Sequence, residues 1–111
     1  LPSTVLSSLV VAELTARART AKARDALEQQ FLAPFERRGR ILAPSAAAWR
    51  RTGTILGASA TAPSASRLTD VLLASQAREF GWTIVTRDAD FTALRRSITG
   101  LKVATPFPPR P

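Results

Sequence analysis

The chain has 111 residues with neither cysteine nor histidine, and 16 Lys and Arg against 8 Asp and Glu give it a net charge of +8. The length fits one domain. Without Cys or His there are no disulfides, thiolate nucleophiles, imidazole bases or usual zinc sites. Any catalysis must therefore use carboxylates, hydroxyls, Lys, Arg or a hard metal ion.

The excess of positive charge indicates a polyanionic partner, nucleic acid first, unless it forms only a solvated basic surface. No apolar run approaches the roughly 20 residues that a membrane helix needs, and no signal peptide is visible. We therefore expect a cytoplasmic protein with no membrane partner.

Helical segments alternate with short extended ones along the chain. Apolar spacing and capping residues predict helices over residues 8–17, 20–33, 45–56, 68–80 and 88–96. Short β-branched or apolar runs predict strands at residues 40–42, 82–86 and 102–105. This alternation predicts an α/β fold with a largely parallel sheet.

Three details of this prediction can be tested directly. Pro34 should end the second helix at about residue 32 or 33. In the helix that Ser45 caps, the stripe that faces the core should consist of Trp49, Thr52, Gly53 and Leu56. Residues 82–86 should form a buried strand, and the proline-rich residues 106–111 an extended ending.

Four of the eight acidic residues are most simply explained as solvated surface groups with basic neighbours. These are Asp25, Glu28, Glu36 and Glu79. Glu13 differs, because it shares a helical face with Leu9, Val10 and Leu14. Either the helix turns Glu13 to solvent near Arg17, or Glu13 points into a polar pocket and holds a metal.

Asp70 lies in the first turn of its helix, where an acid favours the helix dipole. However, it heads a stripe with Leu73, Ala74 and Ala77 that should face the core, which favours a functional role.

Asp88 and Asp90 directly follow the predicted strand that ends at Thr86. Ligands gather at the carboxyl ends of strands in α/β sheets, although either acid could instead only cap the next helix. With Asp70 and Glu13, these two residues would make a cluster of like charges that requires a cation or protonation.

Three segments together resemble PIN domains, and in particular VapC toxins. Residues 8–14 (SLVVAEL) resemble the Ser-x-x-x-x-Glu-Leu segment, and residues 68–81 (LTDVLLASQAREFG) resemble the Asp-x-Leu-Ile-Ala-x-x-Ala segment that ends in Gly. Residues 82–91 (WTIVTRDADF) resemble the strand that precedes Thr-Arg-Asp and Asp-Phe. Residues 100–103 and 106–108 are similar to the typical ending. The resemblance covers nearly the whole chain.

The resemblance implies a Rossmann-like, three-layer α/β/α fold with a mostly parallel central sheet, formed by residues 1–111 as a single domain. It implies RNA cleavage by water activated on Mg²⁺ or Mn²⁺. By position, Glu13, Asp70 and Asp88 match the acidic metal ligands, and Asp90 matches an alternate or helper. Ser8 and Thr86 match hydroxyl positions that steady the acids, or else serve only local capping. The family further implies a homodimer that a cognate antitoxin inhibits.

One departure concerns the beginning of the chain. The family starts with a strand that carries a further Asp, whereas only seven residues precede Ser8 and none is acidic. We therefore expect an N-terminally incomplete domain, with weak metal binding and an exposed sheet edge.

Three other functions compete with the nuclease. The chain could be a non-catalytic PIN-fold module that binds nucleic acid or regulates, which the charge and the missing Asp would both fit. It could be a metal-dependent phosphatase, but the N-terminal strand and nucleophilic Asp loop of that chemistry are not visible. It could also be an interaction protein whose acids are all caps and surface pairs.

Overall fold

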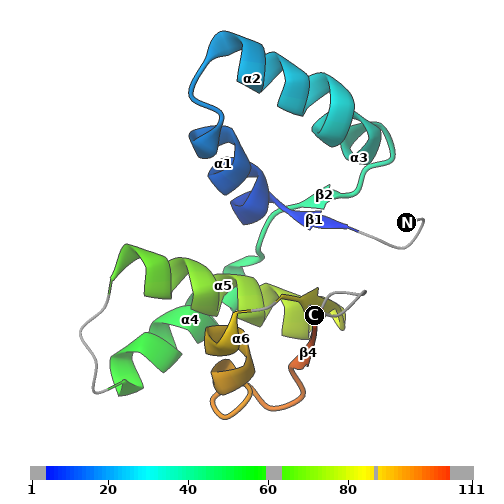
Figure 1. Ribbon diagram of the computed structural model, residues 1–111. Coiled ribbons are helices and arrows are strands. Elements are labelled where there is room, and N and C mark those ends of the chain that lie inside the picture. The colour runs from blue at the N-terminus through cyan, green and yellow to red at the C-terminus, as the bar shows by residue number, and fades with distance from the viewer. Residues whose placement is uncertain (1–4, 60–63, 87, 106–111) are drawn as a thin grey trace. The chain divides into compact units, whose positions relative to one another are not determined.

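The computed structural model describes residues 5–59, 64–86 and 88–105, and the predicted ending at residues 106–111 lies outside this description. The chain divides into two compact units, Leu1–Pro44 and Ser45–Pro111. Each unit holds one pair of parallel strands, connected through helices (Figure 1). Parallel pairing with helical crossovers confirms the predicted α/β class.

In the first unit, strand β1 (Leu6–Ser7) pairs in parallel with β2 (Ile41–Leu42), with Leu6 opposite Ile41. The chain between them forms helix α1 (Ser8–Arg17) and then a longer helical run. The Ser7 hydroxyl caps α1 by accepting a hydrogen bond from the Leu9 backbone N–H at 3.2 Å.

The prediction that Pro34 ends the second helix is wrong. Helix α2 (Ala21–Leu27) continues as a π-helical turn, η1 (Glu28–Leu32), and then as α3 (Ala33–Arg37), which contains Pro34 in its first turn. The backbone N–H of Ala33 donates to the Glu28 carbonyl, the wider spacing of a π turn. The wider spacing of this turn lets the helical run continue through Pro34, which has no backbone N–H to donate to the preceding turn.

In the second unit, helix α4 (Ala46–Ala58) packs against α5 (Ala65–Phe80) (Figure 1). The predicted core-facing stripe of α4 is wrong at Trp49, which is 50% exposed, and at Gly53, which is also exposed. It is correct at Thr52, which is buried, and at Leu56, which is half-buried against the core. Ala48 is the other buried position on α4. The Thr52 hydroxyl donates to the Ala48 carbonyl at 2.8 Å and lies 3.4 Å from the Ser75 hydroxyl on α5. Small side chains at this contact let the two helices approach closely, and the bulky Trp49 remains at the edge.

Helix α5 ends where the sequence predicted, at Gly81. This residue has φ +70°, a left-handed conformation that glycine adopts without steric cost. The Trp82 backbone N–H then donates to the Ala77 carbonyl at 2.8 Å, which satisfies one of the last helical acceptors.

Strand β3 (Thr83–Val85) follows Gly81 and pairs in parallel with β4 (Lys102–Ala104), with Ile84 opposite Val103. The prediction of a wholly buried strand is wrong, because Ile84 is half-buried while Val85 is 62% exposed. This alternation is typical of a strand that packs one face on the core and exposes the other.

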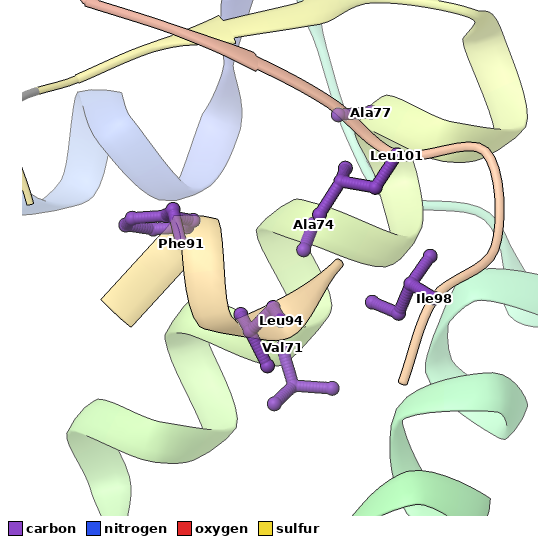
Figure 2. Close-up of a cluster of buried hydrophobic side chains, with 7 residues drawn as sticks. All are labelled: Val71, Ala74, Ala77, Phe91, Leu94, Ile98 and Leu101. Carbon is purple, nitrogen blue, oxygen red and sulfur yellow. The ribbon is translucent and has the colours of Figure 1, made fainter. Parts of the chain in front are cut away.

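Helix α6 (Ala89–Leu94) and the turns after it complete the second unit and its core. Figure 2 shows side chains of α5 facing side chains of α6 and of the segment that follows it. The buried cluster consists of Val71, Ala74, Ala77, Phe91, Leu94, Ile98 and Leu101. It fixes α6 against α5 and so determines where the residues at the start of each helix can lie.

Gly100 is the position where an added methyl group should be costly. Its φ is +87°, and a Cβ atom would stand 2.6 Å from Nε of Arg78, which donates to the Thr99 carbonyl. We expect Gly100→Ala to lower the free energy of unfolding by about 1.5–3 kcal/mol, from the left-handed backbone and the displaced hydrogen bond. Urea denaturation measures this loss.

Gly53→Ala is the matched control. Gly53 lies inside α4 with no atom within 4 Å of an added Cβ, so alanine should raise stability by about 0.5–1 kcal/mol. Equal stability of Gly100→Ala and the wild type would contradict the assigned backbone conformation.

Candidate metal centre

Three aspartates come together in the second unit. Asp70 lies on α5, Asp88 immediately precedes α6, and Asp90 lies in the first turn of α6. One carboxylate oxygen from each lies within 4.8 Å of the other two. Asp70 is half-buried, and the other two aspartates are exposed.

The chain before α6 positions two of these acids through local hydrogen bonds. Thr86 continues the β3–β4 pairing, because its backbone N–H donates to the Ala104 carbonyl at 2.9 Å. The Thr86 hydroxyl accepts from the Asp88 backbone N–H at 3.0 Å, and Asp88 Oδ1 accepts from the Asp90 backbone N–H at 2.9 Å. Asp88 is therefore the N-cap of α6, and capping this helix is one of the two roles predicted for Asp88 and Asp90.

The helix cap uses only part of the hydrogen-bonding capacity of the Asp88 carboxylate. An ionised carboxylate accepts about four hydrogen bonds or metal bonds over its two oxygens, and the cap uses one of them. The cap also fixes the side-chain direction. Asp88 can thus both begin the helix and offer an oxygen to the cluster.

The geometry of the three carboxylates fits a hard divalent cation. Oxygens bound about 2.1 Å from an octahedral ion lie about 3 Å apart when adjacent and about 4.2 Å apart when opposite. The three carboxylate oxygens all lie within 4.8 Å of one another, which is close to this spacing. Three carboxylates this close repel one another, so a bound cation would stabilise the cluster.

The other predicted site residues lie in the first unit. Glu13 is exposed on α1, which agrees with the solvent-facing alternative within that unit. Ser8 is half-buried as the first residue of α1, and Ser7 makes the cap of that helix. Their role in a metal site remains a prediction.

A pocket adjoins Asp70 and Asp90, and sequence reasoning missed part of its lining. Ser66 and Arg67 line it from α5, and Ser97 lines it from the turn after α6. Arg67 precedes Asp70 by three residues and so lies on the same helical face, which is the signal that could have found it. Ser97 carried no comparable signal in the sequence.

The fold and the acidic cluster define an α/β protein with a candidate divalent-metal site. A family model described as the PIN domain matches residues 2–97, which span both units, and the chain belongs to the PIN domain family. The family that the sequence motifs predicted is therefore confirmed. No curated protein matches the chain.

Two solved structures share this fold. A structure of FitAB bound to an IR36 DNA fragment superposes with a TM-score of 0.69 at 22% identity, covering 96% of this chain and 76% of that one. The crystal structure of FitAcB from Neisseria gonorrhoeae has a TM-score of 0.66 at 25% identity, covering 95% of this chain and 76% of that one.

Among the described residues, no helix has the length and apolar character needed to cross a membrane.

Proposed function

We propose that the chain is a metal-dependent endoribonuclease of the VapC toxin type. The observation that carries this proposal is the convergence of Asp70, Asp88 and Asp90 on one point from two helices. Membership of the PIN domain family and the net charge of +8 support it, because a strongly positive chain attracts a polyanion such as RNA.

The site residues have distinct roles in this proposal. Asp70, Asp88 and Asp90 hold Mg²⁺ or Mn²⁺ through carboxylate oxygens, with Glu13 as the further predicted ligand. When bound, such an ion supplies Lewis acidity toward the scissile phosphate and lowers the pKa of a water molecule. Thr86 holds the Asp88 backbone, and the α6 cap holds the Asp88 side chain, so the Asp88 carboxylate is oriented before substrate binds. Ser8 is the second supporting hydroxyl.

We also propose that the two compact units form one PIN domain, since the family match spans both of them. A homodimer and a cognate antitoxin are the proposed protein partners, on the resemblance to VapC toxins. A sedimentation mass twice that of one chain would support the dimer, and a monomer mass would contradict it.

Cleavage of single-stranded RNA tests the proposed activity. With a fluorescein-labelled oligonucleotide, we expect products in Mn²⁺ or Mg²⁺ and none when EDTA replaces the metal, because in this proposal the metal supplies the Lewis acidity toward the phosphate. Gel electrophoresis of the labelled products measures cleavage, and fluorescence anisotropy measures binding.

Two other outcomes are informative. Intact RNA that is nevertheless bound, at every metal tested, would contradict the nuclease and favour the non-catalytic nucleic-acid-binding module, for which the basic charge is the supporting observation. Neither binding nor cleavage would favour an interaction protein.

A further inference from the structure

The pocket beside the acidic cluster has a mixed character that the cluster alone does not explain. Its volume is about 240 Å³, some eight times the roughly 30 Å³ that one water molecule takes in the liquid. Asp70 and Asp90 offer carboxylates on its wall, while Ser66 and Ser97 offer hydroxyls and Arg67 a guanidinium group. The pocket is therefore large enough for a phosphate group with some of its water. Its wall carries both negatively and positively charged groups.

Arg67 is held in an unusual environment for an arginine. Its Nε is buried, and the described part of the chain gives that N–H no hydrogen-bond acceptor. Its Nη2 donates only a long hydrogen bond, 3.4 Å, to the Ser59 hydroxyl. A buried charged donor without an acceptor is costly, whereas a charged acceptor would repay that cost.

The position of Arg67 favours an anion as a partner for the part of its guanidinium group that lines the pocket. Arg67 lies in the first turn of α5, a 16-residue helix whose N-terminal end carries partial positive charge. A guanidinium group also presents its N–H donors in a planar fork that matches two oxygens of a phosphate.

Arg67 is a cationic side chain in the same pocket as Asp70 and Asp90. Its positive charge opposes the negative charge of these carboxylates, which lowers the repulsion that an incoming phosphodiester meets there.

We propose that Arg67 is a substrate-binding residue that donates to a non-bridging oxygen of the RNA phosphate beside the Asp70–Asp88–Asp90 cluster. This inference rests on the proposed function, because it places the phosphate next to the cation that the cluster holds. The alternative is that Arg67 only balances the charge of the aspartates and contacts no substrate.

Nuclear magnetic resonance of the wild-type chain tests the contact directly, without cleavage. The Nε–H resonance of Arg67 is assigned by its loss in Arg67→Lys. It is then followed during titration with adenosine 5′-monophosphate in Mg²⁺, a probe with no phosphodiester bond to cut. We expect a saturable shift of this resonance, because an anion bound to the pocket-facing part of the Arg67 guanidinium group changes the electrostatic environment of its Nε–H. An unchanged resonance while other signals shift, or no binding of the probe, would overturn the proposal.

A pair of charge-matched variants gives the second measurement. We expect Arg67→Gln to weaken binding of the probe, followed through the backbone amides of Asp70 and Asp90, by about tenfold or more. Arg51→Gln removes the same charge from an exposed position on α4 and should change it by about twofold or less. Equal weakening by both variants would mean that only overall charge matters and would overturn the proposal.

Failure of this inference is distinguishable from failure of the nuclease. RNA cleavage with an unresponsive Arg67 resonance overturns the role of Arg67 alone. A responsive Arg67 resonance without RNA cleavage supports the phosphate site and contradicts the nuclease.

Discussion

Asp70→Asn is expected to lower the rate of metal-dependent RNA cleavage by more than about 100-fold. Loss of groups that only orient metal ligands typically costs about 10–100-fold, and Asp70 is a proposed ligand itself. Asparagine has nearly the same shape but lacks the negative charge that binds a hard cation. The measurement is the single-turnover rate of RNA cleavage in Mn²⁺, together with the Mn²⁺ affinity from the signal of the free ion in electron paramagnetic resonance.

Asp25→Asn is the control for this substitution, because Asp25 is an exposed acid on α2 with no proposed role at the site. It should leave both the rate and the Mn²⁺ affinity within about twofold of the wild type. If Asp70→Asn also retained cleavage within about threefold, while melting normally, the three aspartates would not be the metal centre.

Glu13→Gln extends the same comparison to the first unit. If Glu13 is a metal ligand, as its match to the family motif implies, the variant should lose cleavage and Mn²⁺ affinity as Asp70→Asn does. Wild-type values would place Glu13 among the solvated surface acids, consistent with its exposure on α1.

Ile98→Ala is expected to cost about 2–5 kcal/mol of stability and to lower Tm by at least about 8 °C. Ile98 is 2% exposed and packs in the cluster between α5 and the segment after α6 (Figure 2). Alanine would leave a cavity that the surrounding side chains fill only in part. Differential scanning calorimetry measures the change.

Ile98→Val tests whether the loss of stability depends on the volume removed. It removes a single methylene group and should cost about 0.5–1.5 kcal/mol. The two variants should therefore rank in order of the volume removed. A Tm for Ile98→Ala within about 2 °C of the wild type would mean that this side chain is not closely packed.

The order of helices and strands was predictable because local signals define it. Capping side chains mark the starts of helices, as Thr20, Ser45 and Asp88 do, and Gly81 marks an end. Such signals act within one or two turns of the chain. Asp70 was selected on the same basis, since its face of α5 continues into the buried residues Ala74 and Ala77.

The errors arose where longer-range packing overrides local preference. A single π turn absorbs the missing N–H of Pro34, and the sequence carries no signal for that spacing. At Trp49, apolar periodicity favoured the larger side chain, whereas the contact between α4 and α5 selects the small residues Ala48 and Thr52. The pocket wall formed by Arg67 and Ser97 joins residues 30 positions apart, which only the folded chain brings together.

Asp88 caps α6 and is also a proposed metal ligand, and this combination affects which substitutions evolution tolerates at this position. Asparagine caps a helix about as well as aspartate, so Asp88→Asn preserves the start of α6 while removing one charge from the cluster. Alanine removes both at once and costs about 1 kcal/mol in addition. The least destabilising substitution at this position would therefore remove the proposed metal chemistry and retain the fold, so one mutation would be enough to turn such a nuclease into a purely binding protein.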